Sequence, residues 1–292
     1  MRQRETGTFF LFTLPIYLVL FAILIYPIYF CVKMSLSTWD IGTATGKFTG
    51  FEHYSYLLHD PIFWGAIKNV IYISAVAIPL EVVLGFSIAL LVNKTFQDRG
   101  GFINSLLAIP MVTAPVVAGL FWRWLLDPNL GIINYLLNQV YLQLPSWKSS
   151  PFWARNMVAM VAIWKHTPFV ILVMYAGLQS LPKDCLEAAI VDGARAFQRL
   201  WYVVIPLLKR LFLFVFVIRA ADVIKSFDEV YVLTGGGPGS STETPSMFSY
   251  NTAFTYLHMD RGSASGILYL SLSLVFIVLF IRMMYLREKE EF

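Results

Sequence analysis

Charged residues are scarce in this chain, and their scarcity excludes an ordinary water-soluble domain. Only 14% of its 292 residues are Asp, Glu, Lys or Arg, whereas 58% are hydrophobic. Soluble proteins contain about a quarter charged residues. The hydrophobic residues stand in long runs, and a helix needs about 20 of them to cross a bilayer. The sequence therefore predicts a protein whose main solvent is lipid.

Cysteine and histidine are too few for a disulfide framework or a dedicated zinc site. The chain has two cysteines, Cys31 and Cys185, and four histidines. The topology derived below puts the cysteines on opposite sides of the membrane, where they cannot pair. The histidines form no H-E-x-x-H or similar pattern, so we expect no metal and no catalytic residue. A net charge of +4 without a dense Lys/Arg cluster gives no sign of nucleic-acid binding.

A nucleotide-binding loop is also missing. The Walker A pattern is G-x-x-x-x-G-K-[ST], in which backbone N–H groups and the lysine hold phosphates. The nearest stretch, residues 42–48, has one residue too few between its glycines and ends on Phe48. The glycine run at 235–238 has no lysine, and we interpret it as a sharp turn. The sequence predicts no bound cofactor and no enzymatic activity in this chain.

Six stretches are predicted to span the membrane, and the fifth of them decides the topology because it carries seven charged residues. The positive-inside rule favours six spans with both termini in the cytoplasm, since most Lys and Arg residues then fall on the cytoplasmic side. The fold prediction is an all-α membrane protein with a single transmembrane domain over residues 1–292. The approximate spans are 9–32, 67–92, 103–126, 157–179, 207–232 and 264–285.

The cytoplasmic loop between the fourth and fifth spans, residues 180–206, carries an amphipathic pattern. Apolar residues recur there at spacings of four and three, which is typical of one face of a helix. We predict a pair of helices that begins at Pro182 and bends at Gly193. Its apolar stripe could contact the lipid surface, the underside of this protein or a groove on another protein. The stripe comprises Leu186, Ile190, Gly193, Phe197, Leu200, Trp201 and Val204.

Three stretches in this order resemble the permease subunits of ABC importers. Within the loop, Glu187-Ala188-Ala189, Asp192-Gly193-Ala194 and Ile205-Pro206-Leu207 resemble the EAA motif, which forms a coupling helix that docks into a groove of the ATP-binding subunit. Residues 115–134 and 232–238 look like the branch of binding-protein-dependent sugar permeases. The resemblance implies that the docking residues are Glu187, Ala188, Ala189, Asp192, Gly193 and Ala194.

The resemblance also implies a set of partners. These are a second, similar permease, two copies of an ATP-binding subunit that holds ATP and Mg, an extracytoplasmic solute-binding protein and a sugar-like solute. The location implied is the cell inner membrane. The chain is then expected to form half of the solute pathway and to couple it to the separate ATPase by alternating access.

Charged and aromatic residues within the spans are the candidates for the pathway, because each charge there costs about 2.5–3.5 kcal/mol unless it has a partner or a water-filled cavity. Glu81 is either a gate or solute contact or, as we prefer, makes a structural hydrogen bond or ion pair with Arg123 or Arg219. Aromatic residues near span ends more often form an interfacial belt. The pathway candidates are Trp122, Arg123, Trp164, Arg219, Asp222, Asp228 and Asn251.

A transporter driven by an ion gradient is the main alternative to an importer. Glu81 or Asp222 would then carry the coupled proton. The cytoplasmic helix pair would have no role in such a protein, which makes this alternative the weaker hypothesis.

Overall fold

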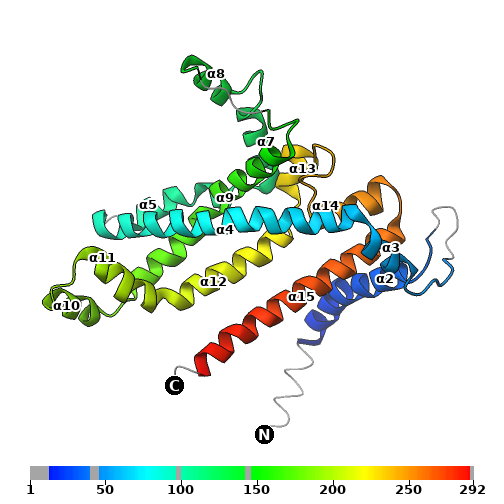
Figure 1. Cartoon of the computed structure of the whole chain (residues 1–292). Coiled ribbons are helices and arrows are strands. Elements are labelled where there is room, and N and C mark those ends of the chain that lie inside the picture. The colour runs from blue at the N-terminus through cyan, green and yellow to red at the C-terminus, as the bar shows by residue number, and fades with distance from the viewer. Residues whose placement is uncertain (1–12, 40–45, 97–99, 142–145, 290–292) are drawn as a thin grey trace, which may run out of the picture. The chain divides into compact units, whose positions relative to one another are not determined.

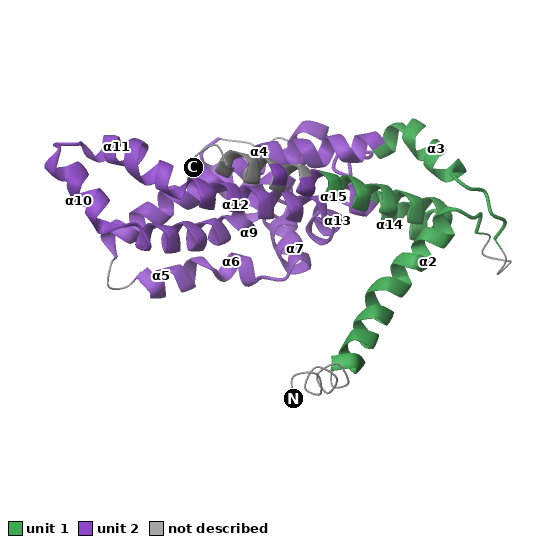
Figure 2. Cartoon of the chain, turned by 90° about the horizontal axis from the view of Figure 1, so that it is seen from below, with its two compact units in different colours: residues 1–63, 248–275 green, residues 64–247, 276–292 purple. Residues whose placement is uncertain are grey.

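The computed structural model describes residues 13–39, 46–96, 100–141 and 146–289. Arg2 and Arg4, the first residues of the expected span 9–32 and residues 42–45 lie outside the described residues. The chain divides into two units, residues 1–63 with 248–275 and residues 64–247 with 276–292 (Figure 2). The all-α prediction is confirmed, because the described residues form helices and no strand, with one isolated bridge between Ser37 and Phe48.

The smaller unit contains the first predicted span. Its helix runs from Thr13 to Ser35, through a π-helical turn at Phe21–Ile25 into α2, Tyr26–Ser35. The short helix α3, Glu52–His59, follows. The other part of this unit holds the end of α14, Pro245–Tyr250, a π-helical turn at Asn251–Thr255 and most of α15, Met259–Lys289. Stacking of Phe63 on Tyr269, with ring centroids 4.9 Å apart, joins the two parts of this unit.

Three long helices, α4, α9 and α12, form the core of the larger unit (Figure 1). They are α4, Pro61–Thr95, α9, Pro151–Gln179, and α12, Ile205–Ile224. α12 continues a helix that begins with α11, Ala196–Arg199, and passes through a π-helical turn at Leu200–Val204. Small residues bring the helices together, since the bare backbone of Gly85 in α4 lies against Val170 in α9.

The structure divides the expected span 103–126 into three helices. These are α5, Gly100–Leu107, α6, Ile109–Val112, and α7, Pro115–Leu125. Proline lacks the backbone N–H that a continuous helix requires, and the residue before it is pushed toward extended backbone. Ala114, just before Pro115, is accordingly extended, with ψ 138°. The break explains why this stretch is not among the five helices that are long and apolar enough to cross a membrane: Thr13–Ser35, Pro61–Thr95, Pro151–Gln179, Ala196–Ile224 and Met259–Val278.

The fifth predicted span, 207–232, also differs from the structure at both ends. The helix begins eleven residues earlier, at Ala196, and α12 ends at Ile224. A separate short helix, α13, covers Asp228–Thr234. The remaining helices of this unit are α8, Ile132–Gln139, and α10, Lys183–Val191. Because α12 stops early, the charged residues near its end lie on both sides of the break between α12 and α13 and not on one continuous helix face.

We expect Gly85→Ala to destabilise the larger unit. A Cβ atom at Gly85 would lie 2.6 Å from the Val170 Cβ atom, so α4 and α9 would have to move apart. Overpacking of this kind costs about 1–3 kcal/mol. Gly65→Ala is the control in the same helix, because a Cβ atom there meets nothing within 4 Å. Thermal unfolding in detergent should show a lower midpoint for the first variant only, and equal midpoints would contradict this packing.

Candidate functional site

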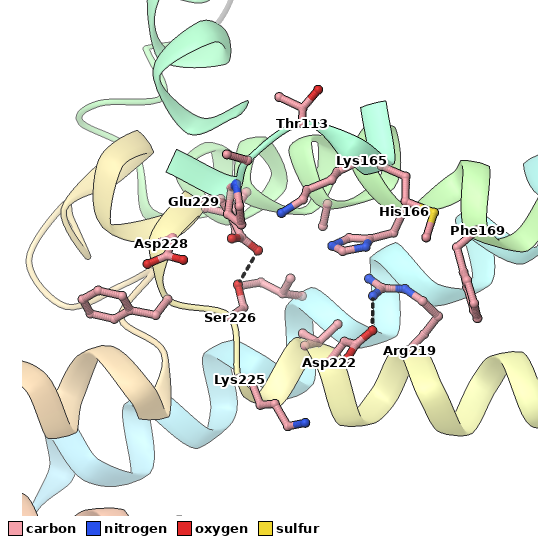
Figure 3. A pocket seen from close by; sticks show the side chains of 18 of the residues that line it. Thr113, Lys165, His166, Phe169, Arg219, Asp222, Lys225, Ser226, Asp228 and Glu229 are labelled. Carbon is pink, nitrogen blue, oxygen red and sulfur yellow. Dashed lines mark hydrogen bonds and ion pairs between the residues drawn. The ribbon is translucent and has the colours of Figure 1, made fainter. Parts of the chain in front are cut away.

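A cavity of about 580 Å³ opens at the point where α12 ends. Its walls come from the segment between α6 and α7, the middle of α9, the end of α12 and the start of α13 (Figure 3). The volume lies within the range of about 300–1,000 Å³ that small-molecule sites occupy. Charged residues and apolar residues share the lining. The charged ones are Lys165, Arg219, Asp222, Lys225, Asp228 and Glu229.

A buried ion pair joins Glu81 of α4 to Arg219 of α12, and Arg219 also lines the cavity. The Arg219 Nε atom donates to Glu81 Oε2 at 2.7 Å, and Nη2 donates to Oε1 at 3.2 Å. The side chains of Arg219 and Glu81 are 1% and 0% exposed. A third hydrogen bond runs from Arg219 Nη1 to Asp222 Oδ2 at 3.2 Å. Of the two partners that the sequence left open for Glu81, the structure therefore has Arg219.

Lys165, His166 and Glu229 also line the cavity, and they are not among the residues predicted from the sequence. Lys165 is 7% exposed and Glu229 is 9% exposed. The Ser226 Oγ atom donates to Glu229 Oε1 at 2.9 Å. A lysine beside a histidine in the middle of an apolar stretch was the available signal for the first two. Nothing in the local sequence indicates that Glu229, on a different helix, reaches the same space.

The predicted pathway residues fall into four places. Arg219, Asp222 and Asp228 line the cavity. Trp122 and Trp164 pack edge to face with ring centroids 5.6 Å apart, and neither of them is part of the cavity lining. Arg123 donates from Nη1 to the Val232 carbonyl at 3.0 Å, beside a second cavity. Asn251 lies in the π-helical turn of the smaller unit.

The predicted docking residues form the end of α10 and the turn after it. The N–H of Gly193 donates to the Ile190 carbonyl at 3.0 Å, and the N–H of Ala194 donates to the Ala189 carbonyl at 3.0 Å. This hydrogen-bond pattern is a Schellman motif, which requires a left-handed residue. Gly193 supplies it with φ +77°, so the predicted bend is confirmed. The second helix, α11, begins after Arg195, whose N–H donates to Gln198 Oε1 at 2.7 Å.

The apolar stripe of this loop is divided between two surroundings. Leu186 and Leu200 pack against the apolar cluster between α4, α9 and α12. Ile190 and Phe197 of the stripe are 55% and 71% exposed, and the neighbouring Val191 is 86% exposed. The expectation of one continuous face is therefore wrong, because the turn at Gly193 ends the first helix. α10 buries none of its residues and lies at the opposite end of the larger unit from α13 (Figure 1).

Comparison with known proteins places the whole chain in one family. Residues 5–290 match the binding-protein-dependent transport system inner membrane component family. The chain belongs to this family. It is thus an inner-membrane permease subunit, and the resemblance seen in the sequence is confirmed.

Two curated relatives and one solved structure illustrate the similarity. The sulfoquinovosyl glycerol permease SmoG of Agrobacterium fabrum is 32% identical over 92% of this chain and 87% of its own. The trehalose/maltose permease MalF of Thermococcus litoralis is 31% identical over 97% of this chain and 95% of its own. A chain of a bacterial alginate ABC transporter, in complex with alginate pentasaccharide-bound periplasmic protein, has the same fold. It aligns with a TM-score of 0.81 at 21% identity, covering 96% of this chain and 94% of that chain.

The glycine run of the permease forms a turn, and two side chains fasten the segment after it to α4 and α9. Gly235 ends α13 in the left-handed conformation, with φ +62°. The Asn69 Nδ2 atom donates to the carbonyls of Ser240 and Glu243, at 2.9 and 3.0 Å. Arg155 Nε donates to the Ser241 carbonyl at 2.8 Å. The interpretation of this run as a turn is confirmed, and the turn borders the second cavity.

A surface ion pair near the second cavity, between Lys148 and Asp127, should make the stability of the permease depend on pH. The Lys148 ammonium, 2.8 Å from Asp127 Oδ2, and the N–H groups of Asn129 and Leu130 lower the pKa of Asp127 from 3.8 to about 2. A carboxyl whose pKa is lowered by folding adds stability above its unfolded pKa and loses that stability as the pH falls through its folded pKa. The contribution should therefore be complete above about pH 5 and absent below about pH 2.

We expect Asp127→Asn to lower the thermal midpoint of the permease at pH 7, through a loss of at most about 1 kcal/mol. Lys148→Met should give a similar decrease. The difference from the wild type should shrink as the pH is lowered from 4 to 2, because the wild-type carboxylate is then protonated as well. A difference that stays constant over this range would contradict the assignment.

Proposed function

We propose that this permease is one half of the solute pathway of an ATP-driven ABC importer for a sugar or sugar-like solute. The main support is α10, a well-formed helix that buries none of its own residues. The Schellman motif holds its end in place while the predicted docking residues stay accessible. A helix with exposed apolar residues and a fixed end is better explained by docking into a groove on another protein than by packing within this chain.

The proposed topology has six membrane crossings and both termini in the cytoplasm. Five crossings are the long apolar helices, and the sixth is the segmented stretch from α5 to α7. Broken helices are tolerated in membranes where the free backbone groups are buried in protein or line a cavity. The segment between α6 and α7 meets this condition, since Thr113, Ala114 and Pro115 line the large cavity. The loop that contains α10 then lies on the cytoplasmic side.

The large cavity is the proposed solute site of this subunit. Arg219, Asp222 and Asp228 line it, which supports three of the pathway candidates. The sugar class rests on relatives whose names state sulfoquinovosyl glycerol and trehalose/maltose as their solutes. Trp122, Arg123, Trp164 and Asn251 remain candidates for other parts of the pathway, in the assembled transporter.

The proposed partners are a second permease, two copies of an ATP-binding subunit and an extracytoplasmic solute-binding protein. The last is supported by the alginate transporter, which was crystallised with its periplasmic protein. The Walker A pattern does not occur in this sequence, so we assign ATP, Mg and ATP hydrolysis to the separate subunit. Closure of the ATPase pair would move α10, and α12 would transmit that movement to the cavity.

An ion-gradient mechanism fits the structure less well. Glu81, one of its two candidate proton carriers, is fully buried and held by two hydrogen bonds from Arg219. A carboxylate in such a pair is a poor proton carrier, because its protonation would leave the buried guanidinium without its partner. Asp222 is half exposed and also contacts Arg219.

Glu187→Lys should prevent the permease from binding its ATPase subunit. Glu187 is exposed on α10, so reversal of its charge changes the proposed docking surface without disturbing the fold. Co-purification of the tagged permease with the ATPase subunit, and ATP-dependent uptake in proteoliposomes, both measure the effect. A loss of at least about tenfold in both corresponds to 1.4 kcal/mol or more of docking energy.

Glu52→Lys is the matched control, since Glu52 is exposed in the first turn of α3, outside the coupling loop. It should leave co-purification and uptake unchanged. Normal association of the Glu187→Lys permease with the ATPase would show that the loop is not the docking element. Solute transport by the permease alone, driven by a proton or sodium gradient, would contradict the importer itself.

A further inference from the structure

We propose that Lys165 and Glu229 select the solute, as hydrogen-bond donor and acceptor for the hydroxyl groups of an uncharged sugar or polyol. This inference rests on the proposed function, because it takes the large cavity as the solute site. It adds to the proposed function that the solute is uncharged and that Lys165 and Glu229 recognise it.

The positive charge of Lys165 lies at the cavity and is not paired with a carboxylate of the described residues. This residue comes from the middle of α9, is 7% exposed, and makes no hydrogen bond or ion pair with any residue that the structure describes. Figure 3 shows its ammonium group pointing into the cavity. The ammonium group itself faces the open space of the cavity and is not one of the fully buried polar atoms. Its three N–H groups are therefore available as donors to a solute that enters the cavity.

Glu229 offers unused acceptor capacity in the same cavity. It comes from the first turn of α13, is 9% exposed, and its carboxylate also points into the space (Figure 3). Its hydrogen-bond donor among the described side chains is the Ser226 hydroxyl, which contacts Oε1 at 2.9 Å. A carboxylate can accept about four hydrogen bonds. Most of its capacity is thus left for a ligand that carries donors.

Arg219 is not a free cation of this site, although it lines the cavity. Three of its N–H groups already donate to carboxylates, two to Glu81 and one to Asp222. Its charge is therefore neutralised within the wall. Of the buried cations in the cavity lining, this leaves Lys165 as the one without a partner among the residues that the structure describes.

The charges around the cavity favour an uncharged solute. Lys165, Arg219 and Lys225 are balanced by Asp222, Asp228 and Glu229, and Glu81 behind Arg219 adds a further negative charge. An acidic solute could pair with Lys165, but it would also bring its anion near these carboxylates, and like charges brought together are unfavourable. A hydroxyl group both donates and accepts. Several hydroxyls on one molecule can serve Lys165 and Glu229 without adding charge.

The test uses the complete importer, with both permeases, the ATPase and the binding protein, in proteoliposomes loaded with ATP. The uncharged probes are sorbitol, trehalose and maltose, and the acidic probes are glucuronate, glucose 6-phosphate and a uronic-acid disaccharide. We expect ATP-dependent uptake of one or more uncharged probes and of no acidic one. Preferential uptake of an acidic probe would overturn the inference, as would the absence of uptake of every uncharged probe.

Variants test the two residues with the transported probe. Lys165→Met and Glu229→Gln should each lower the maximal uptake rate at least about tenfold, while the Kd of the binding protein stays unchanged. The double variant should be little worse than either single one, since both side chains act on one solute. Lys165→Arg, which keeps a cationic donor, should retain more uptake than Lys165→Met. Lys68→Met is the control, because Lys68 is an exposed lysine on α4, outside the cavity lining.

A structural role gives a different result. If either side chain only stabilised the fold, its substitution would lower the thermal midpoint of the solute-free complex together with uptake. We expect the midpoint to stay the same, since Lys165 has no partner to lose in the described part of the chain and the Glu229→Gln side chain can still accept from Ser226. Unchanged uptake in both variants would overturn the inference. Uptake of an acidic probe with ATP would overturn it while leaving the importer intact, whereas failure of the ATPase to assemble contradicts the proposed function.

Discussion

The ion pair between Glu81 and Arg219 is the contact on which the larger unit most depends. Both side chains belong to long apolar helices, and both are almost completely buried. Two charges removed from water are tolerable only when they meet with good geometry, and removal of either one leaves an uncompensated charge. The pair joins α4 to α12 across 138 positions of sequence. It holds α12 in place just before the helix ends, and the cavity opens at that end.

α12 is also the physical link between the two candidate sites. Together with α11 and the π-helical turn it forms one 29-residue helix, Ala196–Ile224. Such a helix is roughly 44 Å long. One end follows the Schellman turn at Gly193, and the other end carries Arg219 and Asp222 into the cavity wall. A movement imposed on the docking loop can therefore reach the solute site through a single helix. Because Arg219 is bound to Glu81, such a movement would act on α4 as well.

The parts of this arrangement that depend on local sequence could be predicted. Lipid requires long apolar runs, so hydropathy finds the spans, and only glycine fits readily in the left-handed turn at 193. The breaks at Pro115 and after Ile224 were missed, because hydropathy averages over a window and does not register a lost backbone hydrogen bond. The convergence of Lys165 and Glu229 could not be predicted, since it depends on how α9 and α13 pack. For the same reason the sequence left Arg123 and Arg219 as equal partners for Glu81.

A double-mutant cycle on Glu81 and Arg219 tests most directly whether their ion pair holds the larger unit together. The variants are Glu81→Leu, Arg219→Met and the double substitution, and the measurement is the free energy of unfolding of the permease in detergent. Each single variant should lose about 3–5 kcal/mol, because it leaves one buried charge alone. The double variant should lose clearly less than either single one. Losses that simply add would show that the two residues stabilise the structure independently, and would contradict this account.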